Sequence, residues 1–188
     1  MLSVDRADFC PTNTYDDKPQ SIGYNTTISA PHMHAITLET LKDHLKKGAS
    51  ALDVGSGSGY ITTCMAELVG ESGRVIGIDH KKELVELAKR NIEKSHSYLL
   101  SSGRIIMVEG DGREGYPDHG PYDAIHVGGA TPEIPQMLFD QLAPGGCMLV
   151  PVGPAGGDQH LMRVDKDENG IMNVCHIMGV IFGALSSN

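Results

Sequence analysis

The chain has 188 residues, of which 40% are hydrophobic and 21% are charged. This length suits a single domain with a buried core, and the composition excludes a disordered or fibrous protein. The formal net charge of −9 repels the phosphates of nucleic acids, so we expect no nucleic-acid partner.

Neither a membrane segment nor a secretion signal is recognisable. No run approaches the roughly 18 apolar residues that a membrane helix needs, and the first residues lack the basic and apolar regions of a signal peptide. The four cysteines have no C-x-x-C spacing, which is typical of free thiols in a reducing compartment. The pair His32-Met-His34 has no acid or cysteine at ligand spacing. We therefore predict a cytoplasmic protein with no membrane partner and no metal site.

Helical and strand patterns alternate from residue 31 onward. Leucines at helical spacing follow Ser29-Ala-Pro31, which resembles a helix cap with proline in the first turn. A strand over 49–54, a helix over 60–69 and a strand over 74–79 come next. A second helix then carries Leu84, Leu87, Ala88 and Ile92 on one face.

The second half continues the alternation and then breaks it. Strands over 105–108 and 122–127 are followed by a helix predicted from Thr131-Pro132-Glu133 to about Leu142, and by a strand over 148–152. Two further strand patterns, 159–165 and 174–182, flank the turn Glu168-Asn169-Gly170. We predict one α/β domain over 1–188 with a doubly wound, Rossmann-like, mostly parallel sheet that ends in an antiparallel hairpin.

The segment Asp53-Val-Gly-Ser-Gly-Ser-Gly59 is typical of a nucleotide-binding loop. Glycines at 55, 57 and 59 permit positive φ angles and a close approach of backbone N–H groups to a ligand. Asp79 ends the next strand, 20 residues after Gly59, where a carboxylate can accept hydrogen bonds from ribose hydroxyls. The dinucleotide fingerprint requires its third glycine at position 60, which is Tyr60, so NAD is disfavoured but stays an alternative.

The other strand ends support the same site. Ligands of doubly wound sheets bind at the carboxyl ends of the strands, where the strand order reverses. Asp111-Gly112 and Gly128-Gly129 follow two further strands, so four loops meet at that edge. Asp111 is predicted to contact the cofactor, with a turn-forming Asx residue as the alternative.

Several segments together resemble the protein L-isoaspartate O-methyltransferase family, and the resemblance covers nearly the whole chain. The most specific is Thr27-Ile-Ser-Ala-Pro-His-Met-His-Ala35. The others include Pro19-Gln-Ser-Ile-Gly23, the glycine loop, Val75-Ile-Gly-Ile-Asp-His80 and Gly110-Asp-Gly-Arg113. Further matches are Pro121-Tyr-Asp-Ala-Ile-His-Val127 and Val150-Pro-Val-Gly-Pro-Ala-Gly-Gly157.

The resemblance implies a class I methyltransferase fold and an activity. The methyl group of S-adenosylmethionine would pass to the free α-carboxyl of L-isoaspartyl residues in damaged proteins and peptides, leaving S-adenosylhomocysteine and starting repair through a succinimide. Ser29 matches the family's active-site serine, and a helix cap is its alternative role. The predicted cofactor-binding residues, from the family and the glycine motif together, are Thr26, Thr27, Ile28, Ser29, His34, Asp53, Gly55, Gly57, Ser58, Gly59, Asp79, Asp111, Gly112 and Ser186.

The resemblance also implies different roles for two parts of the chain, and the sequence differs from the family at a few places. Residues 1–35 match a segment that covers substrate and cofactor, and residues 36–188 match the core. The sequence begins after the family's N-terminal helical segment and ends before its last stretch, and Gly183-Ala184 replaces bulkier residues. The alternative function is therefore a shortened protein that binds the cofactor or an isoaspartyl peptide with little or no turnover. We expect a monomer.

Overall fold

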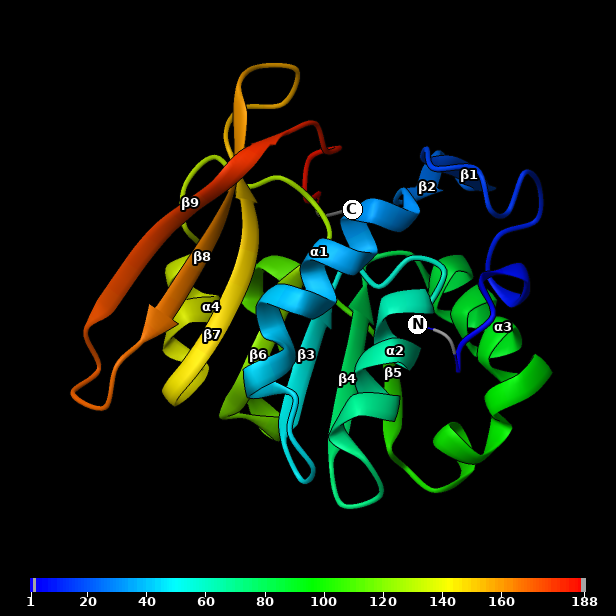
Figure 1. The fold of residues 1–188 in the computed structure, drawn as a ribbon, viewed down its shortest axis with the longest axis horizontal. Coiled ribbons are helices and arrows are strands. Elements are labelled where there is room, and N and C mark those ends of the chain that lie inside the picture. Colours follow the sequence, from blue (N-terminus) through cyan, green and yellow to red (C-terminus); the bar gives the residue numbers. More distant parts are fainter. Residues whose placement is uncertain (2, 187–188) are drawn as a thin grey trace.

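The structure is a computed structural model, which describes residues 1 and 3–186. Its main feature is a seven-stranded sheet in the order β5-β4-β3-β6-β7-β8-β9, parallel from β5 to β7 and antiparallel from β7 to β9 (Figure 1). The predicted fold is thereby confirmed. The strands are β3 Ser50–Val54, β4 Arg74–Asp79, β5 Ile105–Glu109, β6 Tyr122–Val127, β7 Leu142–Val152, β8 Gln159–Lys166 and β9 Met172–Val180.

Helices cover both faces of this sheet. The helices are α1 Pro31–Leu41, α2 Tyr60–Val69, α3 Lys82–Ser101 and α4 Gln136–Asp140, with 3-10 turns η1 Arg6–Asp8, η2 Lys42–His44, η3 Gly112–Glu114 and η4 Pro117–His119. The first three helices share one apolar core, whereas α4 belongs to the other. Successive residues of β3 alternate between them, since Ala51 faces the first core and Leu52 the second. None of the helices in residues 1 and 3–186 is long and apolar enough to cross a membrane.

A short hairpin precedes the sheet and was not predicted. Strand β1 Gln20–Gly23 pairs antiparallel with β2 Thr26–Ile28. Tyr24 and Asn25 form the turn with φ angles of 54° and 55°. Positive φ at both central residues is the type I′ geometry, which asparagine tolerates. This hairpin leads directly into Ser29 and α1, so it carries the most family-specific segment of the sequence to the sheet.

One predicted helix cap and one predicted helix start were wrong, whereas Pro31 lies in the first turn of α1 as predicted. Helix α1 is capped by Ala30 without a side-chain hydrogen bond, so Ser29 is not the cap. The helix predicted from Thr131 is shorter and starts at Gln136, because the backbone N–H of Thr131 donates to Pro151 O and the residue forms a bridge with Val152. Prolines at 132 and 135 supply no N–H to a first turn. The residues 144–146, predicted to follow the helix as a loop, lie within β7.

The glycine loop is packed closely against α3. Gly59 has a φ of +83°, and a β-carbon built on it would lie 3.0 Å from Ala88 Cβ. Gly103 also has a positive φ, +74°, but a β-carbon there would meet nothing within 4 Å. An alanine would strain the backbone at both positions, but its methyl group would clash with a neighbour only at Gly59. Comparing the two substitutions therefore isolates the destabilisation caused by the clash.

We predict that Gly59→Ala lowers the free energy of unfolding by at least about 1 kcal/mol more than Gly103→Ala. Urea denaturation of both variants, followed by circular dichroism, measures the difference. Equal losses would show that the loop does not depend on the close contact with α3.

Candidate functional site

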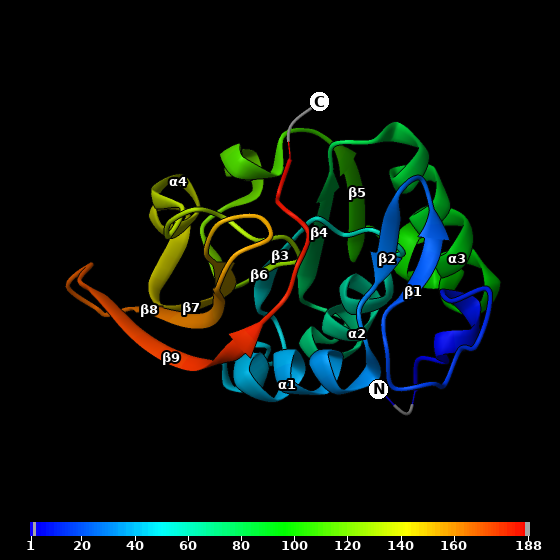
Figure 2. The same ribbon diagram turned by 90° about the horizontal axis from the view of Figure 1, so that it is seen from above.

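Four loops and the C-terminal segment surround a cavity of about 400 Å³ at the carboxyl edge of the sheet. The cavity lies where the strand order reverses, between β3 and β6. Seen from above, the C-terminal segment crosses over the ends of the central strands (Figure 2). The lining residues are Asn25, Thr26, Thr27, Gly55, Asp79, His80, Lys81, Leu84, Gly128, Gly129, Gly183, Ala184, Leu185 and Ser186.

Asp79 joins the glycine loop to this cavity. Its side chain lines the cavity although the residue is only 4% exposed. Oδ2 accepts a hydrogen bond of 3.0 Å from Gly57 N, and Oδ1 accepts one of 3.3 Å from Lys81 N. The N–H groups of Gly55 and Ser56 both donate to Ile78 O, at 2.9 and 3.1 Å. Each carboxylate oxygen keeps acceptor capacity, which suits neighbouring hydroxyls of a ribose.

Asp53 lies behind the loop and is not among the residues that line the cavity. The residue is 1% exposed. Its Oδ2 accepts a hydrogen bond of 2.5 Å from Thr62 Oγ1, and Oδ1 lies 2.8 Å from His126 Nδ1. Because both oxygens have protein partners that link β3 to α2 and β6, the geometry favours a supporting role for Asp53 over direct contact with a cofactor.

Asp111 and Gly112 follow β5 but are not among the lining residues either. Asp111 forms the Asx turn that was its alternative role: Oδ1 accepts from Arg113 N at 3.0 Å, and the carboxylate pairs with the Arg113 guanidinium at 2.6 Å. That hydrogen-bonded pairing lowers the pKa of Asp111. A β-carbon on Gly112 would lie 2.6 Å from Val54 Cγ1, so the backbone there comes very close to β3. Contact of these two residues with a cofactor stays a prediction.

The remaining predicted residues fall into two groups. Thr26, Thr27 and Ser186 line the cavity, as do Gly55 and Asp79. Ile28, His34, Gly57, Ser58 and Gly59 are buried around it. Ser58, for example, has its hydroxyl engaged by Tyr60 N and its carbonyl by Asn91 Nδ2.

The C-terminal segment is fastened to the loop after β6. Ala130 N donates to Gly183 O and Leu185 N donates to Ala130 O, both at 2.8 Å. A β-carbon on Gly129 would lie 2.9 Å from Leu185 Cα. The absence of a side chain at Gly129 therefore allows residues 183–186 to approach the loop and line the cavity. No pattern in the sequence points to Leu185, since a lone apolar residue outside a helix or strand has no periodicity.

A second cavity of about 590 Å³ lies beside the first. It is lined by Pro19, Ala30, His32, Met33, Gly157, Asp158, Gln159, His160, Met178, Gly179, Val180, Ile181 and Phe182. At two places in the sequence, a residue that lines one cavity is close to a residue that lines the other. Thr27 lines the first and Ala30 the second, while Phe182 lines the second and Gly183 the first.

Ser29 is not among the residues that line either cavity, but in the chain it lies between Thr27, which lines the first, and Ala30, which lines the second. It is half-buried, between the end of β2 and the start of α1. Within residues 1 and 3–186 its hydroxyl makes no hydrogen bond, whereas its carbonyl accepts one of 2.8 Å from Arg6. A hydroxyl with a fixed backbone and no intramolecular partner is available to a ligand.

His34 is buried near the start of α1, behind Ser29. Its ring centroid lies 4.8 Å from that of Tyr60, and its Nδ1 lies 3.1 Å from Arg6. Burial lowers the pKa of His34 well below the ordinary value of 6.5, and the positive charge of Arg6 lowers it further. The imidazole is therefore neutral at neutral pH.

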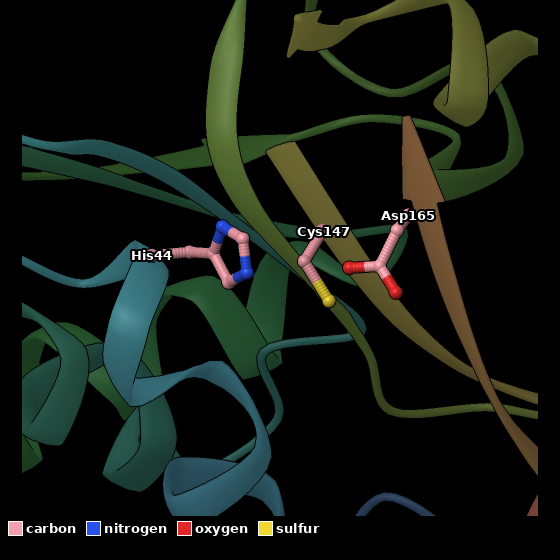
Figure 3. Close-up of side chains that lie close together, drawn as sticks. All are labelled: His44, Cys147 and Asp165. Atoms are coloured by element: carbon pink, nitrogen blue, oxygen red, sulfur yellow. The ribbon is translucent and has the colours of Figure 1, made fainter. Parts of the chain in front are cut away.

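Outside these cavities, His44, Cys147 and Asp165 bring their side chains together, with ligand atoms within 4.8 Å of one another (Figure 3). Arg163 donates to both oxygens of Asp165, at 2.8 to 3.1 Å. Burial raises the pKa of Cys147 to about 12, so its thiol is protonated at neutral pH. A cation here would face a guanidinium charge and a protonated, buried sulfur, and we assign the cluster a packing role.

Comparisons with known proteins agree with the geometry. The family model of protein-L-isoaspartate(D-aspartate) O-methyltransferase (PCMT) matches residues 1–188. A protein-L-isoaspartate O-methyltransferase of Caenorhabditis elegans is 53% identical over 187 residues, which cover 100% of this chain and 83% of the relative. One from Triticum aestivum is 50% identical over 190 residues, covering 100% and 82%. The beta-aspartate methyltransferase (PCMT) of Plasmodium falciparum, in complex with S-adenosyl-L-homocysteine, superposes with a TM-score of 0.92 at 35% identity, covering 100% of this chain and 88% of that one.

The lowered pKa of His34 has a measurable consequence for stability. Between the folded-state pKa and the unfolded-state value of about 6.5, the unfolded chain binds one more proton at this position. The stability contribution is therefore present above pH 6.5 and is lost as the pH falls through that window. We predict that the free energy of unfolding drops more steeply below pH 6.5 in the wild type than in His34→Gln, by up to about 1.4 kcal/mol per pH unit.

Urea titrations of both proteins at pH 7.5, 6.5 and 5.5 measure this difference in slope. Parallel pH dependences would contradict the buried, neutral state of His34.

Proposed function

The chain belongs to the protein-L-isoaspartate(D-aspartate) O-methyltransferase family, and from this membership we propose how its own residues carry out the reaction. The enzyme transfers the methyl group of S-adenosylmethionine to the free α-carboxyl of L-isoaspartyl residues in damaged proteins and peptides. S-adenosylhomocysteine is the second product. The methyl ester then closes to a succinimide, whose hydrolysis returns part of the damage to normal aspartate.

The first cavity fits the cofactor. Asp79 supplies a buried carboxylate for the ribose hydroxyls, and Gly55, with Gly57 behind it, supplies a backbone without side chains for close approach. Thr26 and Thr27 come from the β1–β2 hairpin, and Ser186 comes from the C-terminal segment. When bound, the cofactor supplies an electrophilic methyl group on a positively charged sulfur. These residues would hold it from three sides.

The observation that carries the proposed mechanism is that Ser29 lies in the chain between Thr27 of the first cavity and Ala30 of the second, with a hydroxyl that has no hydrogen-bond partner within residues 1 and 3–186. A substrate carboxyl is ionised at neutral pH, so it needs no general base. Ser29 Oγ donates a hydrogen bond to one carboxylate oxygen and orients the other. With S-adenosylmethionine bound, that oxygen would be placed to form the new bond to the methyl carbon, and the electron pair of the broken carbon–sulfur bond would stay on sulfur. Orientation of this kind can lower a barrier by roughly 7 to 11 kcal/mol.

The second cavity suits the peptide that carries the carboxylate. Its lining combines apolar side chains, including Met33, Met178 and Phe182, with backbone of the β8–β9 end. Strand β9 is an edge strand, and its free backbone groups can pair with an extended peptide. His160 and His176 lie at this side, with Nδ1 and Nε2 3.0 Å apart. We propose that a damaged segment lies here in extended form, with its isoaspartyl carboxylate at Ser29.

Further aspects of the function are part of the same proposal. Residues 1–35 cover cofactor and substrate, and residues 36–188 form the core of a single domain. We propose that the protein acts as a cytoplasmic monomer with no nucleic-acid partner, which its net charge of −9 supports. The competing function is a protein that binds its ligands without turnover. It is considered because Gly183-Ala184 stands where the family has bulkier residues.

We predict that the purified chain transfers labelled methyl from S-adenosylmethionine to an isoaspartyl peptide and not to the aspartyl peptide of the same sequence. Ser29→Ala lowers kcat by about 10- to 100-fold, because one hydrogen bond to a charged group is lost. Ser95→Ala, an exposed serine on α3, leaves kcat unchanged and serves as the control.

Three outcomes would contradict this account. Equal labelling of both peptides removes the specificity. Cofactor binding by calorimetry without transfer establishes the binding protein instead. Binding of NADH in place of S-adenosylmethionine would support an oxidoreductase.

A further inference from the structure

We propose that Arg6 is a positioning residue for this reaction, because one buried guanidinium fixes both the backbone of Ser29 and the ring of His34. The inference rests on the proposed function, since Ser29 is the residue that would orient the substrate. Nothing in the sequence pattern pointed to Arg6: it stands in a short, aperiodic segment, 23 residues before Ser29 and 28 before His34.

Arg6 uses each of its nitrogen atoms. It lies in η1 and is 5% exposed. Nε donates to Thr14 O at 2.7 Å, one terminal nitrogen donates to Ser29 O at 2.8 Å, and the other lies 3.1 Å from His34 Nδ1. Cζ lies 5.8 Å from the centroid of the Tyr60 ring. The planar fork of a guanidinium matches several acceptors at fixed angles, which a lysine ammonium does not.

The contact with His34 determines which imidazole nitrogen carries the proton. A guanidinium has only donors, so Nδ1 of His34 must be the acceptor and the proton of the neutral ring lies on Nε2. Burial opposes protonation of this ring, the positive charge of Arg6 opposes it further, and any positive charge on His126 or His32 would act in the same direction. Arg6 therefore sets the tautomer as well as the orientation of His34.

Within residues 1 and 3–186, no ion pair includes Arg6, and the carboxylate on which its charge acts, Asp17, is not in direct contact with it. A buried arginine held only for stability is ordinarily paired with an acid. Here the positive charge is left next to Ser29, where the substrate carboxylate would be held, so it favours binding of an anion.

Arg6 also links the two halves of the site. Its aromatic partner Tyr60 is the first residue of α2 and directly follows Gly59, the end of the cofactor loop. Its carbonyl partner Ser29 immediately precedes Ala30, which lines the second cavity. A single side chain thus connects the residue that would orient the methyl acceptor to the element that follows the loop for the methyl donor.

The chain contains a matched control in Arg104. Its terminal nitrogen donates to a backbone carbonyl, Ala66 O, at 2.9 Å, and its Cζ lies 5.8 Å from the centroid of Tyr98. Arg104 immediately precedes β5, at the amino edge of the parallel strands and therefore opposite the site. Substitutions there remove the same kinds of contact without touching Ser29 or His34.

The experiment compares Arg6→Lys and Arg6→Met with Arg104→Lys and Arg104→Met. Nitrogen-15 NMR of the histidine side chains gives the tautomer and the titration of His34, steady-state methyl transfer to an isoaspartyl peptide gives kcat and KM, and thermal unfolding gives stability. In the wild type we expect His34 protonated on Nε2 only.

Arg6→Lys keeps the charge but cannot reach all three acceptors, so we expect kcat to fall about tenfold with KM nearly unchanged. Arg6→Met also loses the charge. We expect KM to rise at least about tenfold, and the pKa of His34 to move upward as Nδ1 loses its donor and the cation is gone. Both Arg104 variants keep the wild-type kcat, KM and His34 signals.

An unchanged His34 tautomer and titration in both Arg6 variants would overturn the proposal. The proposal would also be overturned if the Arg6 and Arg104 variants had equal thermal stability and showed the same changes in kcat and KM. If Arg6→Met does not fold, the Arg6→Lys signals of His34 decide the question alone. Failure of the proposed function looks different: the wild type transfers no methyl, while the His34 signals still respond to substitution of Arg6.

Discussion

Two buried carboxylates at the ends of neighbouring strands hold the site together. Asp53 is the last residue but one of β3, just before the glycine loop. Asp79 is the last residue of the neighbouring strand β4. Both are nearly inaccessible to water, and a buried charge is tolerated only with partners. Asp53 takes Thr62 and His126, and Asp79 takes the backbone of Gly57 and Lys81. The need to satisfy these charges fixes the loop, the start of α2 and the end of β6 relative to one another.

This arrangement leaves the reaction with a modest chemical task. The nucleophile is already ionised and the leaving group is neutral once it departs, so the protein mainly has to position two reactants and exclude water. The structure provides two cavities for this, and Ser29 lies in the chain between a residue that lines one and a residue that lines the other. Segments far apart in the sequence, namely the β1–β2 hairpin and residues 183–186, line the first cavity together. Both ends of the chain therefore contribute to a site built on the central strands.

The features that could be predicted from the sequence are those with a local signal. The alternation of apolar strands and amphipathic helices predicted the sheet, and the spacing from Gly59 to Asp79 predicted that Asp79 lies at the same edge of the sheet as the glycine loop. The alternative role of Ser29 as a helix cap was wrong because α1 begins at Pro31, which makes Ala30 the residue at the cap position. The helix at Thr131 was wrong because pairing with Pro151 and Val152, about twenty residues away, took its backbone groups.

Other features of the site were missed because they depend on contacts between residues far apart in the sequence. Arg6 has no periodic neighbours, and its three acceptors come from a turn, a junction and a helix that only the fold brings together. Leu185 lines the cavity only because Gly129 has no side chain. Asp53 matched the motif in sequence, but in the structure its two carboxylate oxygens contact Thr62 and His126. A sequence motif does not show whether a carboxylate contacts a ligand or other side chains of the protein.

The most direct test of the central claim is a crystal structure of this chain with S-adenosylhomocysteine and an isoaspartyl peptide. The account predicts the ribose hydroxyls on Asp79, the sulfur in the cavity between the glycine loop and residues 183–186, and the peptide α-carboxyl within hydrogen-bonding distance of Ser29 Oγ. A ligand bound elsewhere, or a peptide carboxyl remote from Ser29 while the sulfur occupies the cavity, would contradict it.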